Sequence, residues 1–345
     1  MDAIAIGSAA GFNFQGSGSV GIGVQAGTQF QGTGAVAMGY QAGWTGQSEN
    51  AVAIGYQAGW VVQDKNCVAI GPSAGAYFQQ KQAVSIGQEA GFTGQISYAV
   101  AIGFQAGYSG QQNESVAVGR GAGFSGQKDQ SIAIGSRAGQ DNQDKNAIAI
   151  GANAGISLQA NGCVAIGTNA GGVGQGQYSI CIGSDAGPTS MPAHAIFLNA
   201  SGSAFTPGAS GLYAAPVRAG LPLSGNLMYY NPFTSEIFQS SSSLKYKTNV
   251  ADLDLTSASN NLYSLNPRSY NYLSSMERDC IGYIAEEVQA IDPRLSVNDL
   301  QGEAMNVDWN NIVLYLVAAL KKQKNDLTAQ INDLTKRVET LERKG

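Results

Sequence analysis

Residues 52–59 read Val-Ala-Ile-Gly-Tyr-Gln-Ala-Gly, and this short string decides the fold of most of the chain. Its first glycine, Gly55, belongs to a series that recurs at every sixteenth position, twelve times from Gly7 to Gly183 without an insertion. A second glycine, always preceded by alanine, follows each of these four residues later. A strict period is typical of solenoids, in which each repeat contacts only its neighbours. Because sixteen residues are too few for a helical repeat, the period predicts a coil of short strands and tight bends.

Each repeat contains one strand signal just before its first glycine. Val52 and Ile54 show the pattern: both flanking positions are aliphatic in every repeat, and the residue between them, here Ala53, is always small. This alternation predicts a short strand with two different faces. We expect the branched aliphatic side chains to fill a core and the small residues to allow close approach of the backbone. The alanine–glycine pair that follows permits a tight bend, because glycine tolerates positive φ.

A glutamine recurs eight residues after the first glycine, eleven times from Gln15 to Gln175. Glutamines in phase are expected to stack as a ladder whose amides bond the turns above and below. At 196–199 the phase continues, but Phe197 replaces the small residue and Asn199 the glycine, which is typical of a capping turn. The sequence therefore predicts a mainly β rod over residues 1–199, with twelve repeats and a cap.

The string VAIG-x-x-AG resembles the head repeats of trimeric autotransporter adhesins. That resemblance implies a left-handed β-roll in which three chains pack together. The period of 16 residues is longer than is usual in that family. This difference affects the expected conformation of the loops more than the expected architecture. The membrane anchor and signal peptide of those adhesins are missing, so a virion or phage fibre is favoured over a bacterial surface adhesin.

Composition excludes several kinds of site. The 345 residues contain a single histidine, His194, which excludes a histidine-centred triad and a multi-histidine metal site. The cysteines are spread without a CxxC pair, so neither a zinc ribbon nor a disulfide scaffold is indicated. Three of them occupy small-residue slots of the repeat and are expected to be core residues, as is the fourth. We expect no metal and no cofactor. The four are Cys67, Cys163, Cys181 and Cys280.

Charge and hydropathy exclude further classes. A net charge of −5 and a pI near 4.9 argue against nucleic-acid binding. Residues 1–4 lack the basic start of a signal peptide. The longest apolar stretch, 312–320, is far shorter than the ~20 residues of a membrane span. We therefore expect no membrane insertion.

Charged residues are spread unevenly, which indicates two regions. There are 17 in residues 1–239 and 26 in residues 240–345, so the charge density changes sharply near residue 240. Residues 200–239 are rich in Gly, Pro and Ser and end in LMYYNPFTSEIFQ, which has short strand-like runs around turns. This segment is interpreted as a neck between the rod and a C-terminal domain at 240–345.

An aromatic residue often follows the second glycine, for instance Trp44, Trp60 and Tyr108. We favour an aromatic ladder that seals the seam between turns or chains. The alternative is an exposed stripe that binds glycans by stacking.

The C-terminal region carries four segments in order. They are SSSSLKYKTNV (240–250), LYSLNPRSYNYL (262–273), DCIGYIAEEVQAIDPRL (279–295) and VDWNNIVLYLVAALKKQ (307–323). Together they resemble the intramolecular chaperone domain at the C-terminus of phage endosialidases, neck appendages and other fibres. The resemblance implies an α+β domain that drives trimerisation of an upstream β-fibre and then cuts itself off with a serine–lysine dyad.

The resemblance places the dyad at Ser242 and Lys247, since Lys247, Asn249 and Val250 match the end of the pattern Ser-x-x-x-x-Lys-x-(Asp/Asn)-(Ile/Val). A serine hydroxyl needs a base within hydrogen-bond reach. With no histidine nearby, only a lysine can serve, and it must be uncharged, which burial in a newly formed trimer interface favours. The pair Ser240 and Lys245 has the same spacing and stays open, as does a serine-rich linker with two solvated lysines.

Three other features of this domain have structural interpretations. Glu286 and Glu287 lie on a short amphipathic helix, where a solvated face is favoured over a role in orienting the lysine. Asp308 is expected to cap the final helix. Heptads over residues 312–342 predict a coiled coil, in which leucines at d and mainly β-branched residues at a favour a dimer. We expect a trimer instead, because Lys324 interrupts the a series and a three-chain fibre is implied by both resemblances.

These observations predict a structural fibre or spike of a virion, made in the host cytoplasm and assembled as a homotrimer. Its partner would be a host-surface receptor or glycan. Its C-terminal domain would act once, in cis, as a self-processing serine endopeptidase. The alternative is a trimeric binding protein or adhesin whose C-terminal domain trimerises it and never cuts. A conventional glycan-cleaving enzyme lacks support, because the repeat has no paired carboxylates at a defined cleft.

Overall fold

The computed structural model describes residues 2–217, 228–231, 234, 236–239, 243, 245, 247–273, 279–299 and 301–343. The chain divides into two compact units, Met1–Gly220 and Leu221–Gly345. The finer boundaries expected at residues 199 and 239 stay predictions.

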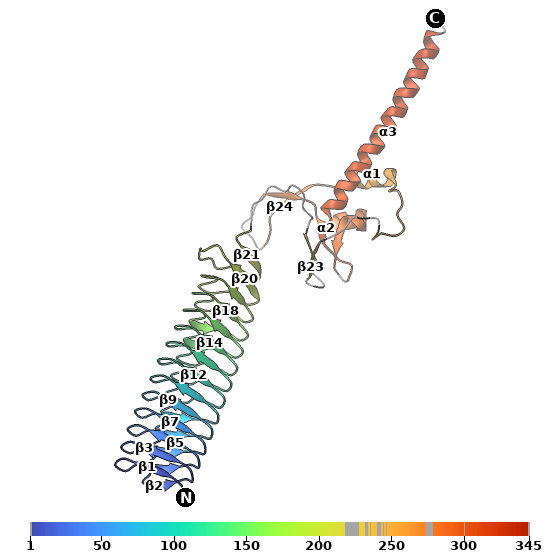
Figure 1. Cartoon of the computed structure of the whole chain (residues 1–345). Helices are drawn as coiled ribbons and strands as arrows, with labels where there is room; N and C mark the ends of the chain where they lie inside the picture. The colour runs from blue at the N-terminus through green and yellow to red at the C-terminus, as the bar shows by residue number, and fades with distance from the viewer. Residues whose placement is uncertain are drawn as a thin grey trace. The chain divides into compact units, whose positions relative to one another are not determined.

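The first unit is a stack of turns, each of which adds one short strand to a parallel sheet (Figure 1). Strands pair with the strand 16 residues later, so that Val52 lies opposite Val68 and Ile54 opposite Ile70. The predicted mainly β solenoid, with about 13 turns of 16 residues, is confirmed. The strands are β1 (Ile4–Ile6), β3 (Val20–Ile22), β5 (Val36–Met38), β7 (Val52–Ile54), β9 (Val68–Ile70), β11 (Val84–Ile86), β12 (Val100–Ile102), β13 (Val116–Val118), β14 (Ile132–Ile134), β16 (Ile148–Ile150), β18 (Val164–Ile166), β19 (Ile180–Ile182), β20 (Ala195–Asn199) and β21 (Gly211–Ala215).

A second parallel ladder runs along the stack, and each of its strands ends at one of the repeated glutamines. Val61 lies opposite Tyr77 in this ladder, and isolated bridges such as Thr93 to Ser109 continue it where no strand is formed. Its strands are β2 (Asn13–Gln15), β4 (Gln29–Gln31), β6 (Thr45–Gln47), β8 (Val61–Gln63), β10 (Tyr77–Gln79), β15 (Asp141–Gln143) and β17 (Ser157–Gln159).

The interior of the stack is filled by alanine and glutamine, so the predicted branched aliphatic core is wrong. Ala53 and Gln63 are fully buried, whereas Val52 and Ile54 on the other face of the strand are half-buried. The alternation correctly indicated that the strand has two different faces, but the face that we expected to be buried is the outer one. A turn of 16 residues encloses a thin interior that holds one alanine face and one extended amide, and the aliphatic side chains therefore point outward.

The buried glutamines form the predicted ladder. Gln63 Nε2 donates to the carbonyl of Val52 at 2.8 Å and to Gln79 Oε1 in the next turn at 3.1 Å. The same pair of bonds recurs along the stack, for instance from Gln111 to Val100 and Gln127. Because a buried polar group costs stability unless it is hydrogen-bonded, this ladder makes an amide tolerable in the core.

Two glycines per turn are required by close contacts. At Gly55 (φ +128°) an added Cβ would lie 2.8 Å from the carbonyl oxygen of Gly71, so the stacking of turns excludes a side chain there. At Gly59 (φ +53°) it would lie 2.8 Å from Gln63 Oε1. The repeated glycines thus serve both the bend and the ladder.

The aromatic stripe is a ladder along the stack. Rings of successive turns lie about 5–6 Å apart from Trp44 through Trp60, Tyr77, Phe92 and Tyr108 to Phe124. Such contacts between neighbouring turns support the structural interpretation over a purely binding one.

The last turns close the interior with larger side chains. Phe197 is buried at the end of the alanine core and packs edge-on against Phe205, with ring centroids 5.5 Å apart. The sheet nevertheless extends one strand further, because β21 pairs in parallel with β20.

The second unit is α+β. A hairpin joins β22 (Met228–Asn231) to β23 (Glu236–Gln239), as the strand-like runs of the neck predicted. Small antiparallel pairs and three helices follow, and the unit ends in one long helix (Figure 1). In order they are α1 (Leu255–Tyr263), β24 (Arg268–Tyr270), β25 (Cys280–Gly282), α2 (Ala285–Ile291), the 3-10 turn η2 (Pro293–Leu295), β26 (Ser296–Asn298), β27 (Ala304–Val307) and α3 (Trp309–Glu342).

Candidate functional site

The segment with the predicted dyad is described only in part. Lys247 and Lys245 are exposed on the single chain. Ser242 and Ser240 lie outside the described residues. The dyad assignment, with its alternative, therefore stays a prediction.

The segment leads directly into α1, which is fixed at its start by Asp254. The Asp254 carboxylate accepts a hydrogen bond from the Thr256 amide at 3.0 Å, a typical N-cap. The helix buries Ala258 against α3 within a core that also contains Val288 and Leu295. The dyad segment is thus anchored at its C-terminal end by a small hydrophobic core.

Asp292 is the centre of a polar cluster beside that core. Its carboxylate accepts two side-chain hydrogen bonds from Arg294, at 3.0 and 2.7 Å, and one each from Tyr315 Oη (2.6 Å) and Asn261 (3.1 Å). The Asp292 side chain is 6% exposed and that of Arg294 is 62% exposed. The Arg294 guanidinium, more than the other partners, lowers the pKa of Asp292 far below its usual value. Burial and the Asp292 carboxylate raise the pKa of Tyr315 to about 12.

The cluster joins residues of the three helices to Arg294 on η2, which identifies it as a structural clasp. Asn261 lies on α1, Asp292 at the end of α2 and Tyr315 on α3. Sequence analysis missed this clasp, although an aspartate directly before proline and arginine in DPRL is a local signal for a capped turn, and Asp292 does accept from the Arg294 amide at 3.1 Å.

The two glutamates of α2 have different surroundings. Glu287 forms a bidentate pair with Arg268 on β24, at 2.9 and 3.1 Å, whereas Glu286 is exposed. The pair ties the helix to the β24–β25 hairpin. It supports the structural interpretation of these carboxylates over a role in orienting the lysine.

The long helix α3 has the predicted N-cap and an apolar seam that is exposed on the single chain. Asp308 caps it by accepting from the Asn311 amide at 3.1 Å. Beyond the core, the heptad positions are exposed on the single chain; Leu327, for example, is 50% exposed. The seam, defined by its a and d positions, comprises Val317, Leu320, Lys324, Leu327, Ile331, Leu334, Val338 and Leu341.

Within the described ranges, no group of three or more His, Cys, Asp or Glu side chains is placed to hold a metal ion. The same part of the chain contains no helix that is both long and apolar enough to cross a membrane. The four cysteines are free thiols, three buried in the rod and Cys280 half-buried.

Comparison with known proteins gives one family match. Residues 242–296 match the model of the family described as chaperone of endosialidase. No curated protein and no solved structure matches the chain. The matched stretch begins at the serine of the predicted dyad and ends just after η2, so it contains Lys247, α1, α2 and the Asp292 clasp residue.

Proposed function

We propose, from a family match and a β-solenoid that together fit a phage fibre with a C-terminal chaperone domain, that this chain is a fibre or spike subunit of a virion. Its second unit assembles three chains and then releases itself from the rod. The match over residues 242–296 is the observation that carries the proposal, because that family comprises self-cleaving intramolecular chaperones.

Two unpartnered apolar surfaces support assembly with further copies of the chain. The first is the outward aliphatic face of the rod, on which residues such as Ile102 and Ile134 are more than a third exposed. The second is the seam of α3. Contiguous apolar surfaces of this kind mark interaction sites, and heptad seams pack against identical helices. Three copies would cover both surfaces, in agreement with the implied trimer.

The cut is proposed to occur next to Ser242 after assembly. Ser242 Oγ attacks the carbonyl carbon of an adjacent peptide bond while its proton passes to the uncharged Nζ of Lys247. The resulting ammonium protonates the leaving amine, and water then hydrolyses the ester to restore the hydroxyl. The products would be a rod of about 241 residues and a chaperone fragment of about 104. Lys247 is exposed on the single chain, so burial by neighbouring chains would be what removes its charge.

Alanine variants of each dyad member test the assignment. Ser242→Ala and Lys247→Ala are expected to remain full length on a denaturing gel, since loss of a nucleophile or base costs several powers of ten in rate. Both variants should still trimerise, because folding and cutting use different atoms. Ser240→Ala and Lys245→Ala are the matched controls and should be processed like the wild type.

The opposite pattern identifies the alternative pair. Processing of Ser242→Ala together with an uncut Ser240→Ala would shift the dyad by two residues and overturn the assignment. A wild-type trimer that stays full length would favour the alternative function, a trimeric binding protein whose C-terminal domain never cuts.

A further inference from the structure

One row of polar side chains along the rod has a gap. The row consists of the residues two places after each first glycine, and all of them have a positive φ. Their side chains can bond from turn to turn: Gln41 Nε2, for example, donates to Gln25 Oε1 at 2.8 Å. Gln105 continues the row by donating to Glu89 at 2.8 Å. At the next turn the slot is occupied by Gly121, which has no side chain to contribute.

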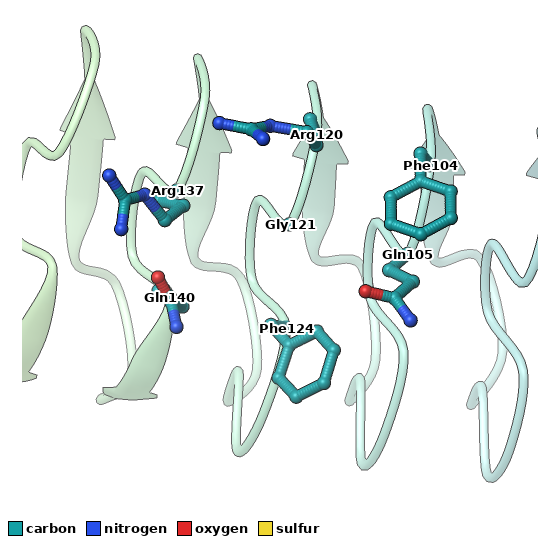
Figure 2. A pocket seen from close by; sticks show the side chains of 7 residues that line it. All are labelled: Phe104, Gln105, Arg120, Gly121, Phe124, Arg137 and Gln140. Atoms are coloured by element: carbon teal, nitrogen blue, oxygen red, sulfur yellow. The ribbon is translucent and has the colours of Figure 1, made fainter.

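The gap opens a hollow of about 420 Å³. This volume lies within the roughly 300–1,000 Å³ of small-molecule sites. Figure 2 shows Gly121 in the middle, with side chains from the neighbouring turns around it. The lining residues are Phe104, Gln105, Arg120, Gly121, Phe124, Arg137 and Gln140.

The hollow has two arginines without acidic partners. In the described part of the chain neither Arg120 nor Arg137 forms an ion pair, and Arg120 only donates to Ser136 Oγ at 3.4 Å. Lysines of nearby turns differ, since Lys128 and Lys145 both pair with aspartates. Two guanidiniums on adjacent turns, neither of them in an ion pair with a described residue, therefore place two positive charges at one hollow.

The other walls are apolar or offer hydrogen bonds. Phe104 is 44% exposed, and Phe124 is the last ring of the aromatic ladder, because the next turn has Gln140 at its position. Gln140 Oε1 is buried and accepts no hydrogen bond from any described residue. An amide acceptor without a donor is satisfied when a ligand hydroxyl reaches it.

We propose that this hollow binds an acidic saccharide. The carboxylate would be held by Arg120 and Arg137, since guanidinium–carboxylate pairs are strong and directional. The apolar C–H face of the sugar ring would lie on Phe124 or Phe104, and its hydroxyls would meet the amides of Gln105 and Gln140. The inference deepens the receptor-contacting part of the proposed function and rests on it only for the source of the ligand.

Binding can be measured with methyl glucuronide and methyl glucoside, which differ in the carboxylate. Ligand-observed NMR on the full-length chain should show about tenfold tighter binding of the glucuronide, the size of effect that one charge-assisted pair gives. Equal binding of the two sugars, or of neither, would overturn the proposal. If inorganic phosphate binds as tightly as the glucuronide, the hollow binds anions without recognising the sugar, and the saccharide assignment is wrong.

A variant that fills the gap tests binding at the hollow without disturbing the fold of the rod. In Gly121→Gln the new side chain takes the slot and the positive φ (52–58°) that Gln25, Gln41, Gln57 and Gln105 already adopt, so the rod should remain folded. Glucuronide binding should disappear in this variant and in Arg137→Asn. Lys81→Gln, which removes one exposed charge outside the hollow, is the control and should bind like the wild type.

The same samples distinguish the two proposals. Native mass and a denaturing gel report assembly and cutting independently of sugar binding. A normal trimer that ignores glucuronide would overturn only the binding inference. A chain that binds glucuronide as a monomer would overturn only the proposed trimeric assembly.

Discussion

Tyr315 and Asp292 are joined by a hydrogen bond of 2.6 Å that ties the first turns of α3 to the end of α2. Tyr315 is buried in the core of the second unit, and the carboxylate it contacts also accepts from Arg294 and Asn261. The contact therefore links the long helix α3 to the part of the chain that matches the chaperone family.

The clasp predicts acid sensitivity of the second unit. The pKa of Asp292 is lowered in the folded chain, chiefly by Arg294, so its contribution is present above the unfolded value of about 3.9 and is lost as the pH falls below it. Thermal unfolding of the helical signal should shift downward below about pH 4. In Asp292→Asn that acid-induced shift should be smaller, and a variant with the full wild-type shift would contradict the assignment.

Tyr315→Phe isolates the hydrogen bond from the ring. The substitution should lower the free energy of unfolding by about 1.5–3 kcal/mol at neutral pH, because one hydrogen bond to a charged acceptor is lost while packing is kept. Unfolding by denaturant, followed by far-UV circular dichroism, measures the change. No loss of stability would show that the bond is not stabilising.

The glutamine ladder predicts a graded loss of rod stability. Gln111 Nε2 donates to Val100 O and Gln127 Oε1, and Gln95 donates to Gln111 Oε1 at 3.0 Å. Gln111→Ala loses these bonds and leaves a cavity, and should cost about 2–5 kcal/mol. The matched variant is Gln111→Met, because Met191 fills the same slot in a later turn. The stability of the Gln111→Met rod should lie between that of the wild type and that of Gln111→Ala. A Gln111→Met rod as stable as the wild type would show that the ladder bonds add nothing.

Thiol reactivity should distinguish the rod from the second unit. Burial raises the pKa of Cys67 to about 11 and that of Cys181 to about 12, and also raises that of Cys163. Since the thiolate is the reactive form, these three should resist a thiol reagent in the native protein. Half-buried Cys280 should react first. Labelling of one site when native and four when denatured is the expected count, and rapid native labelling of the rod thiols would contradict the alanine-like interior.

The α3 seam predicts which change prevents assembly. Leu327→Asp places a charge in the middle of the apolar d series and should convert the trimer to monomer or aggregate in sedimentation equilibrium. Leu314 is also apolar and exposed but outside the heptad series, so Leu314→Asp is the matched control. Unchanged trimers of Leu327→Asp would rule out the seam as the assembly contact.

The repeat made the rod predictable, but not which face is inside. The spacing of Gly55, Gly71 and their equivalents is enough to predict the turns, and the phase of Gln63 predicts the ladder. The alternation Val52-Ala53-Ile54 shows two faces without saying which one is buried. That depends on the width of the turn, and only the structure reveals that Ala53 and Gln63 already fill it.

Features that depend on contacts between distant residues were harder to predict. The hollow at Gly121 arises from a missing side chain in a row, so no motif marks it. The Asp292 clasp joins residues 23 and 31 positions apart. The match to residues 242–296 agrees with the resemblance drawn from the four C-terminal segments, whereas the serine of the predicted dyad lies outside the described residues.

The order of assembly and cutting tests the account most directly. Native mass spectrometry of the wild-type chain, sampled over time after a pulse of expression, should show a full-length trimer first. That species should then convert to a trimer of rods of about 241 residues with fragments of about 104, while Ser242→Ala stops at the full-length trimer. Cut monomers that appear before any trimer would contradict the proposed coupling, and a wild-type trimer that never converts would contradict self-release.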